Sequence, residues 1–273
     1  MKERLDRIIV ERHSLDTREK ARAFIIGGNI TVDGQTVTKP SSMVDGQANI
    51  QLRIPNRGYV SRGGIKLEGA LRDFCLNVCG AFCLDIGAST GGFTDCLLRC
   101  GAREVVALDV GKNQLDYRLR KDQRVVVIEK FNARFIDGLQ LASVPDIVTV
   151  DVSFISLRLI LPPLKRIIDY DTEVVGLVKP QFELAKPFRN FRGVVKDAAV
   201  HIDILQELDT FFIHSGYGSR RYAFSRIRGP KGNMEFFVHL RKTKGHISTG
   251  ELPTIENVVT QAHRYFSKNT FSS

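Results

Sequence analysis

Four charged residues stand where an α/β protein gathers its chemistry. Asp151 and Lys179 each end an apolar run, Lys66 lies early in a helical stretch, and Glu235 begins another apolar run. Ligands of an open parallel sheet bind at the carboxyl ends of its strands, so charges placed there can act on a substrate. A lone lysine at a strand end is more often a surface residue whose aliphatic stem lies on apolar neighbours. Together, two amines and two carboxylates at converging positions predict a catalytic cluster that holds a nucleophile and receives its proton.

A glycine-rich stretch, FCLDIGASTGGFTDCLL, reads as a strand, a turn and the start of a helix. Gly87 lets the chain turn, and Gly91 and Gly92 allow a ligand to approach the backbone at a helix N-terminus. Position 89 is Ser, so the G-x-G-x-x-G dinucleotide fingerprint is incomplete and NAD is disfavoured. A turn with a purely structural role is the alternative.

Two acids frame this turn. Asp85 ends the strand before Gly87, and Asp109 ends the next apolar run, at the spacing of an acid that accepts ribose hydroxyls. A turn flanked by acids suits a positively charged cofactor, S-adenosylmethionine, better than a pyrophosphate. We therefore predict that Asp85 faces the cationic amino or sulfonium end of this cofactor and that Asp109 binds its ribose.

The chain beyond residue 64 alternates between apolar runs and helical patterns. The runs cover residues 82–88, 104–110, 124–130, 146–152 and 173–179. This alternation predicts an α/β fold with a mostly parallel sheet and helices on both faces. We expect a further helix over 197–215, a closing antiparallel pair from 222–229 and 234–242, and a polar tail over 246–273 that is weakly helical around 255–266.

The first 56 residues form a module of their own. Their pattern predicts two short amphipathic helices, the second beginning after Asp16 or Thr17, and a hairpin that turns at Asp33 and Gly34. The formal net charge of the chain is +10, which indicates a polyanionic partner, nucleic acid more commonly than an acidic membrane. No apolar segment approaches the roughly 20 residues of a membrane span, and the N-terminus lacks a signal-peptide core, so we expect a cytoplasmic protein.

The five cysteines crowd into residues 75–100. They lack a C-x-x-C spacing or a nearby pair of histidines, which disfavours a zinc site. We expect buried free thiols, with metal binding and redox chemistry as lesser alternatives.

Several motifs resemble one known family. SRGGIKL, DIGASTGGFTD, VDVSFISL, LVKPQFE and GNMEFF occur in the order found in the TlyA, or hemolysin-like, family, and the pattern G-x-I-x-V-x-G-x-x-V after the first helices resembles the S4 RNA-binding domain. The resemblance covers nearly the whole chain. It implies a small α+β S4-like domain over 1–56, a linker over 57–63, a class I (Rossmann-like) methyltransferase domain of the FtsJ kind over 64–245, and a C-terminal tail or helix over 246–273.

The same resemblance implies an activity and a site. Family members methylate the 2′-oxygen of cytidine in ribosomal RNA, with S-adenosylmethionine as the donor, so the implied partners are ribosomal RNA or ribosomal subunits. The implied catalytic tetrad is Lys66, Asp151, Lys179 and Glu235. The cofactor contacts expected from the residues and the resemblance together are Asp85, Gly87, Ala88, Ser89, Gly91, Gly92, Phe93, Asp109 and Asn132, and no metal is expected. Lys179 either accepts the hydroxyl proton or orients the oxygen, and the sequence leaves both roles open.

Other chemistries fit less well. The fourth run is followed by Ser153 and Phe154 instead of the N/D-P-P-Y/F of amine methyltransferases, and no cysteine follows a proline as in C5-pyrimidine enzymes. Two rival functions stay open, a membrane-active cytolysin and an RNA-binding protein without catalysis. The modified nucleotide, the subunit that carries it and the oligomeric state cannot be read from the sequence.

The stretch LAKPFRNFRGVVK, after Glu183, alternates cations with phenylalanines and so predicts contacts to phosphates and unpaired bases. A basic surface loop with inward phenylalanines is the alternative. The predicted RNA-binding residues are Arg4, Arg7, Arg18, Lys20, Arg22, Arg62, Lys186, Arg189 and Arg192. A second basic cluster comprises Arg220, Arg221, Arg226, Arg228 and Lys231, and the stretch RGYVSRGG between the modules reads as either a hinge or a rigid turn.

Overall fold

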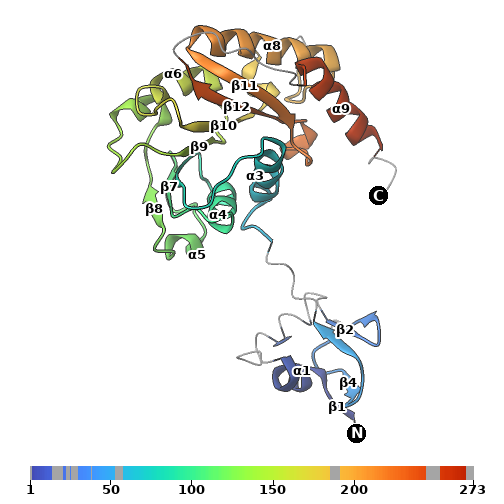
Figure 1. Ribbon diagram of the computed structural model, residues 1–273. Coiled ribbons are helices and arrows are strands. Elements are labelled where there is room, and N and C mark those ends of the chain that lie inside the picture. Colours follow the sequence, from blue (N-terminus) through green and yellow to red (C-terminus); the bar gives the residue numbers. More distant parts are fainter. Residues whose placement is uncertain are drawn as a thin grey trace. The chain divides into compact units, whose positions relative to one another are not determined.

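The computed structural model describes residues 2–13, 21–22, 25, 30–37, 39–52, 58–184, 191–243 and 253–268. The chain separates into two compact units, Met1–Gly58 and Tyr59–Ser273. Each unit is described by itself, and both are drawn in Figure 1.

The smaller unit is built from short strands and helix α1. Its elements are β1 (Lys2–Arg4), α1 (Leu5–His13), β2 (Ile30–Val32), β3 (Gln35–Thr36), β4 (Met43–Asp45) and β5 (Ile50–Leu52). Strand β1 pairs with β4, and β2 pairs with both β3 and β5, all antiparallel. The hairpin prediction is confirmed, since Asp33 and Gly34 take φ of 50° and 83° between β2 and β3. The predicted cap of the second helix at Asp16 or Thr17 lies outside the described residues.

The larger unit is built on a seven-stranded sheet in the order β11-β12-β10-β9-β6-β7-β8. Its strands are β6 (Phe82–Ile86), β7 (Glu104–Leu108), β8 (Val125–Ile128), β9 (Ile147–Val150), β10 (Glu173–Val178), β11 (Tyr217–Phe224) and β12 (Phe236–Lys242). Strands β6 to β10 are parallel, and β11 and β12 add an antiparallel edge. All five apolar runs predicted from the sequence contain strands. The closing antiparallel pair is confirmed, but its first strand, β11, covers 217–224 and so lies earlier than the predicted 222–229.

Helices cover both faces of this sheet, as Figure 1 shows. One face carries α3 (Arg62–Asp73), α4 (Gly92–Arg99) and α5 (Tyr117–Arg120), and the other carries α6 (Leu161–Leu164), α8 (Ala198–His214) and α9 (Ile255–Lys268). Short connections add η1 (Ala133–Gly138), η2 (Leu157–Leu159), α7 (Pro180–Glu183) and η3 (Pro230–Gly232). Each face buries its own cluster of aliphatic and aromatic side chains, which is why the central strands are apolar on both sides.

Local signals explain where the main helices begin. The side-chain oxygens of Ser61 and Asp197 accept backbone N–H groups at the starts of α3 and α8 and so satisfy donors that a helix leaves unpaired. Helix α9 is more regular than the weak helical pattern of its sequence suggests. It packs Val258, Val259 and Phe266 into the cluster beneath α8, and this burial stabilises a helix that its polar residues alone do not.

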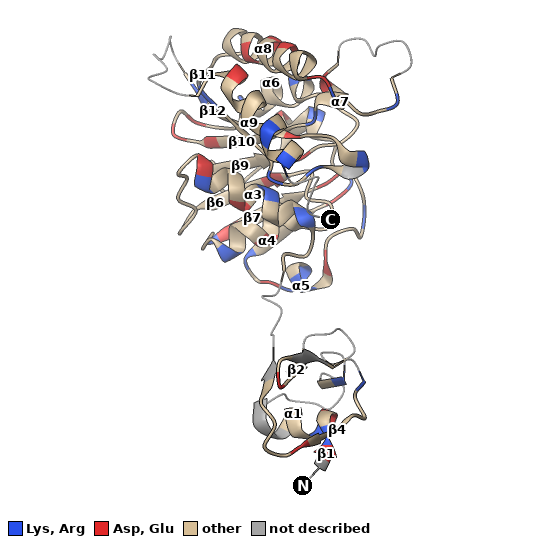
Figure 2. Ribbon diagram, turned by 90° about the vertical axis from the view of Figure 1, so that its right-hand side faces the viewer, with Lys and Arg blue, Asp and Glu red and all other residues tan. Residues whose placement is uncertain are grey.

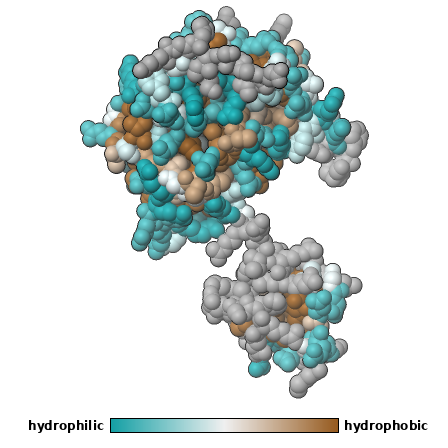
Figure 3. Space-filling model, viewed as in Figure 1, coloured by the Kyte–Doolittle hydropathy of each residue, from teal (hydrophilic) through white to brown (hydrophobic). Residues whose placement is uncertain are grey.

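The surface seen in Figure 3 is mainly hydrophilic, with apolar atoms in small areas between polar ones. Among the described residues, the structure contains no helix with the length and apolarity of a membrane span.

The cysteine prediction is only partly correct. All five thiols are free, but Cys83 and Cys96 alone are buried, whereas Cys75, Cys79 and Cys100 are exposed. The two buried thiols lie on β6 and on the inner face of α4, and the other three follow the ends of helices or precede a strand, where the chain reaches the surface.

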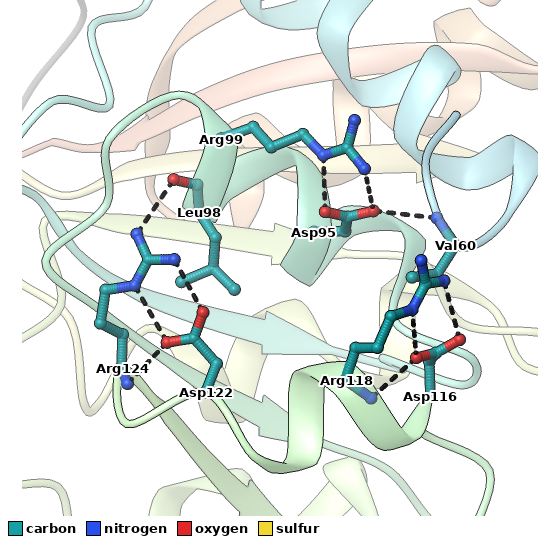
Figure 4. A network of polar contacts seen from close by, with 8 residues as sticks. All are labelled: Val60, Asp95, Leu98, Arg99, Asp116, Arg118, Asp122 and Arg124. Carbon is teal, nitrogen blue, oxygen red and sulfur yellow. Dashed lines mark hydrogen bonds and ion pairs between the residues drawn. The ribbon is translucent and has the colours of Figure 1, made fainter. Parts of the chain in front are cut away.

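Residues 59–61 are fastened to α4. The Asp95 carboxylate accepts the Val60 N–H at 2.9 Å and a bidentate pair of bonds from Arg99, as Figure 4 shows. The Arg99 guanidinium lies 4.7 Å from the centroid of the Tyr59 ring. Tyr59 also packs on Gly64, where a Cβ atom would lie 2.1 Å from the ring. This part of the stretch RGYVSRGG therefore belongs to the larger unit, and its contacts favour the rigid turn over the hinge.

We predict that Tyr59→Ala lowers the free energy of unfolding of the larger unit by ~2 kcal/mol, since a half-buried ring and its cation–π contact are lost. Tyr59→Phe keeps the ring and serves as the matched control, with a much smaller loss. Urea unfolding of the full chain, followed by circular dichroism, measures both. Equal stabilities of the Ala and Phe variants would show that the ring does not hold this turn.

Candidate active site

The sheet brings the four predicted charges to one place. Asp151 directly follows β9, Lys179 follows β10, and Glu235 directly precedes β12. Parallel pairing sets Gly176 opposite Val150, and antiparallel pairing sets Val178 opposite Phe236. This register places the ends of β9 and β10 beside the start of β12.

Two ion pairs join these residues. Lys66 Nζ lies 2.5 Å from Glu235 Oε2, and Lys179 Nζ lies 2.6 Å from Asp151 Oδ1. Lys66 reaches the cluster from the first turns of α3, whose N-terminal end packs against Gly92 of the glycine turn. The convergence of these four side chains, expected from the sequence, is present in the structure.

Three of the four charged side chains are shielded from water, and Asp151 is partly exposed. Glu235 is 0% exposed, Lys66 8% and Lys179 9%. Burial raises the pKa of Glu235, and the neighbouring Lys66 and Lys179 oppose that rise. A carboxylate so deeply buried stays ionised only beside cations, so Glu235 and the two lysines depend on one another.

Ser153 joins the cluster, although it was not among the predicted site residues. Lys179 Nζ donates to Ser153 Oγ at 2.7 Å while it also pairs with Asp151. The amine thus has one hydrogen-bond acceptor, Ser153 Oγ, and one ion-pair partner, the Asp151 carboxylate. The motif VDVSF contains this serine, but a single serine after a strand does not by itself indicate a site residue. Its role becomes visible only because the fold places Lys179 within hydrogen-bonding distance.

Phe154 was also missed. Its side chain is 90% exposed, and it takes φ of 63°, in the left-handed region that β-branched and bulky residues rarely adopt. Its ring lies 5.1 Å from that of Phe182. An exposed aromatic ring held in a strained conformation beside Asp151 and Lys179 is a candidate surface for stacking.

The glycine turn is shaped by close backbone contacts. Gly87 has φ of 86°, and a Cβ atom there would lie 2.4 Å from the Asp151 carbonyl oxygen. Gly91 has φ of 96° immediately before α4, where a Cβ atom would meet the Leu119 side chain at 2.2 Å. A larger residue at position 87 would push the turn away from the end of β9, and one at position 91 would push it away from Leu115 and Leu119.

A cavity of about 570 Å³ opens beside the turn. Its lining includes Gly87, Ser89, Asp109, Phe131, Asn132 and Arg134, together with Asp151 to Ile155. A volume of this size accommodates a nucleoside-sized ligand. Of the predicted cofactor residues, Gly87, Ser89, Asp109 and Asn132 lie here.

Asp109 stabilises the glycine turn by hydrogen bonds to backbone N–H groups. Its carboxylate accepts the Ser89 N–H at 2.8 Å and the Gly111 N–H at 2.6 Å. A carboxylate accepts about four hydrogen bonds, so Asp109 retains acceptor capacity toward the cavity. Asn132 is exposed at the same cavity, and its side-chain oxygen caps η1 by accepting the Arg134 N–H.

A second, smaller hollow of about 170 Å³ adjoins the first. It is lined by Ser61, Gly63, Lys66, Gly87, Ala88, Ser89, Thr90, Gly92, Phe93, Asp151, Ser153 and Lys179. Both spaces share Gly87, Ser89, Asp151 and Ser153. The ion-paired lysines therefore face a space that adjoins the larger cavity at the glycine turn, and Ala88, Gly92 and Phe93 lie on the side of the lysines.

Asp85 does not take the predicted position. It is 0% exposed and lines neither space, since its carboxylate accepts the hydroxyls of Thr94 and Thr149 at 2.7 and 2.8 Å. Burial raises its pKa to about 6. The sequence predicted that Asp85 contacts a cationic ligand directly, and the structure corrects this prediction. The Asp85 carboxylate is instead bonded to Thr94 of α4 and Thr149 of β9 and so connects the glycine turn to both elements. The strand alternates its side chains, and the sequence did not show which face of β6 Asp85 occupies.

The predicted RNA-binding cations fall into three groups. Arg7, Arg22, Arg62 and Arg192 are exposed. Arg4 is exposed but makes two hydrogen bonds to Asp6. Arg18, Lys20, Lys186 and Arg189 lie outside the described residues. Arg62 also donates a hydrogen bond to the backbone carbonyl of Arg228 at 2.9 Å. Arg228 lies shortly before Glu235 in the sequence.

The second basic cluster is largely engaged within the protein. Arg220 pairs with Asp209, Arg226 with Asp73, and Arg221 donates to His239. Arg228 donates to the Gly232 carbonyl, and Lys231 is exposed. These contacts make most of this cluster structural. Among the described residues, no group of three His, Cys, Asp or Glu side chains is placed to hold a metal ion.

Comparisons with known proteins agree with this geometry. The family model for FtsJ-like methyltransferases matches residues 59–242, and the S4 domain model matches residues 3–50. YqxC of Bacillus subtilis, provisionally named an rRNA methyltransferase, is 42% identical over 96% of this chain and 95% of its own length. The 16S/23S rRNA (cytidine-2'-O)-methyltransferase TlyA of Mycobacterium tuberculosis is 41% identical over 87% of this chain and 89% of its own. The solved structure of a Streptococcus thermophilus protein, provisionally named a hemolysin, covers 98% of both chains at 40% identity with a TM-score of 0.72.

The buried position of Asp85 predicts a pH-dependent stability. Its pKa of about 6 in the folded protein exceeds the ordinary ~3.9 of the unfolded chain, so the folded state holds the proton longer. The stability that the folded state gains from holding this proton is complete below pH ~4 and is lost as the pH rises through ~6. The side chain of Asp85→Asn cannot ionise. Between pH 4 and 7, the free energy of unfolding of the wild-type protein should therefore fall by about 3 kcal/mol relative to that of Asp85→Asn.

Urea unfolding at several pH values measures that difference, and calorimetry with S-adenosylmethionine gives a second readout. Affinity for the ligand should survive in Asp85→Asn, because Asp85 lines neither space. A stability difference that stays constant with pH, or a large loss of affinity, would contradict this position for Asp85.

Proposed function

Because the chain belongs to the family of FtsJ-like methyltransferases, we propose that it moves the methyl group of S-adenosylmethionine to a ribose 2′-hydroxyl of ribosomal RNA, with cytidine as the target nucleotide. The S4 domain and the methyltransferase domain expected from the sequence are both confirmed. The observation that carries the proposal is the pair of lysine–carboxylate contacts, whose lysines line the smaller space and whose Asp151 lines both adjoining spaces.

The larger cavity fits the proposed cofactor. Asp109 offers carboxylate oxygens to a ribose diol, and Phe131 and Asn132 offer an apolar face and polar atoms to an adenine ring. Asp151 is the acid nearest to the junction with the smaller space, and a carboxylate there favours a sulfonium. Arg134 is the one cation in the described lining, so most of the cavity suits a cationic ligand better than a pyrophosphate.

The bound cofactor would supply an electrophilic methyl carbon on sulfur, and a new oxygen–carbon bond would form as the carbon–sulfur bond breaks. The protein has to hold the hydroxyl in line and manage its proton. Lys179 lines the smaller space, donates to Ser153 and pairs with Asp151, and the 2′-oxygen would occupy a hydrogen-bonding direction that the amine has left. A neutral amine takes the proton from there, whereas a charged amine donates to the oxygen, turns a lone pair toward the carbon, and leaves the proton to water.

Lys66 and Glu235 keep this amine in place. Glu235 is bound to Lys66 and feels the charge of Lys179, so it compensates two cations at once. Without that buried carboxylate, two lysines would face one small space and repel each other. The second pair therefore sets the position and charge of the first.

The target nucleotide would need to leave its stack to reach Lys179. Phe154 offers an exposed ring at the mouth of the site on which a base can stack, and Phe182 supports it from behind. Arg62 and Arg192 are exposed cations on the same unit that can contact phosphates.

The charges of the larger unit favour one approach. Helices α3 and α4 carry cations among their acids, whereas the charged residues of α8, apart from its histidines, are all acidic, as Figure 2 shows. Acidic residues repel phosphates, so RNA would bind away from α8. A cytoplasmic location follows from the proposed substrate and stays a prediction.

The direct test is incubation of the pure protein with radiolabelled S-adenosylmethionine and unmethylated ribosomal subunits. We expect label in the RNA, and digestion followed by mass spectrometry should find it in 2′-O-methylcytidine. Label in a base, or no label with either subunit, would overturn the proposal. A liposome leakage assay with the same protein tests the rival membrane activity, and leakage without methyl transfer would support that rival.

We predict that Lys179→Ala loses about 100-fold or more of methyl transfer while S-adenosylmethionine binding survives, because proton handling is lost and the cavity is not. Lys179→Arg separates the two roles, since arginine stays charged and cannot act as a base. Single-turnover rates with saturating RNA measure both variants.

Lys165→Ala is the matched control, because this lysine donates to the Ser215 carbonyl at 2.8 Å away from the site. It should retain activity. A Lys179→Ala enzyme with a near-normal rate would remove Lys179 from the chemistry, and an active Lys179→Arg enzyme would show an orienting role.

A further inference from the structure

Asn233 is a buried polar residue that the proposed chemistry does not use. It is 2% exposed and stands two positions before Glu235. Its side-chain oxygen accepts the Val195 N–H at 3.0 Å, and its side-chain nitrogen donates to the Gly193 carbonyl at 2.9 Å. The side-chain amide thus accepts one backbone N–H and donates to one backbone carbonyl, as a neighbouring strand does. Both partners lie about forty residues earlier in the chain.

The turn around Asn233 also shapes the position of Glu235. The Asn233 carbonyl accepts the Gly229 N–H at 2.9 Å, and the Glu235 carbonyl accepts the Ser225 N–H at 2.9 Å. Gly229 lies so close to Glu235 that a Cβ atom there would be 2.1 Å from Oε1. A shift of Asn233 would therefore move the carboxylate that holds Lys66.

The segment held by Asn233 carries a predicted RNA contact. Arg192 is exposed and directly precedes Gly193, whose carbonyl is bound by the Asn233 amide. Val195, the other partner, is buried in the core. One side chain thus links an exposed cation and a buried catalytic carboxylate that come from distant parts of the chain.

We propose that Asn233 is a positioning residue, which sets the RNA-contacting segment around Arg192 in register with Glu235 and the Lys66 pair. This inference rests on the proposed function. When Arg192 binds an RNA phosphate, it holds the same segment that Gly193 and Val195 bond to Asn233. RNA binding is thereby connected to the turn that carries Glu235. The bond from Val195 is buried and the bond to Gly193 is partly buried, so loss of either leaves a shielded backbone group unpaired and lets the segment and the turn drift apart.

The test compares Asn233→Ala with Thr172→Ala in steady-state methyl transfer to ribosomal subunits. Thr172 is the matched control, since it is also buried and its hydroxyl donates to a distant backbone carbonyl, that of Pro145, at 2.8 Å. It precedes β10 at the end opposite Lys179. Both variants lose a buried hydrogen bond to the backbone, but only Asn233→Ala should change the site.

We expect Asn233→Ala to lower kcat/KM for RNA by ~10- to 100-fold, as misplacement of a catalytic group does. The loss should fall on both kcat and KM for RNA, while the affinity for S-adenosylmethionine measured by calorimetry is unchanged. Thr172→Ala should lose stability and keep its kinetics. Asn233→Asp keeps an acceptor for Val195 and loses the donor to Gly193, so its kcat/KM should lie between wild type and Ala.

Asn233→Ala and Thr172→Ala with equal kinetics would overturn the inference and leave Asn233 a structural residue. If Asn233→Ala does not fold, Asn233→Asp decides, and wild-type kinetics in that variant likewise overturn the inference. A wild-type protein that is inactive on all RNA would instead reject the proposed function and this inference together.

Discussion

A buried carboxylate needs cations, and this constraint organises the catalytic unit. Glu235 is fully buried, and Lys66 and Lys179 are the cations that act on it. Charges removed from water are tolerated only when they are paired. Helix α3, the ends of β9 and β10, and the start of β12 must therefore meet at one point, and a wrong placement of any of them leaves a buried charge alone.

Backbone register makes that meeting possible. The parallel pairing of β9 with β6 and β10 brings Asp151 beside both the glycine turn and Lys179. Gly87 then touches the Asp151 carbonyl so closely that any side chain would separate them. Gly87 also lines both spaces, so the absence of a side chain there keeps the turn against β9 and leaves the two spaces adjoining.

The strands of the larger unit, the helix over 198–214 and the four charged residues follow from sequence, because they depend on hydrophobic period and on chain order. The short strands β1, β4 and β5 were not predicted. Asp85, Ser153 and Phe154 did not follow from sequence either. Asp85 points into the protein, which its position in β6 alone does not reveal. Ser153 matters because Lys179 lies 2.7 Å away, and the exposure of Phe154 depends on a local φ of 63°. The contacts of the second basic cluster were not visible in the sequence for a similar reason, since the acids that pair with Arg220 and Arg226 come from α8 and α3.

The amino-acid sequence by itself determined the alternation of strands and helices, the glycine turn, the basic balance and the types of group available for chemistry, because these are properties of neighbours along the chain. Only the tertiary structure decided which charges pair, which acid faces the cavity and which cations are free, because those outcomes depend on distances between residues far apart in sequence. The Asn233 amide bonded to Gly193 and Val195 is of this second kind. No local pattern shows such a link, since its geometry exists only once the sheet has closed.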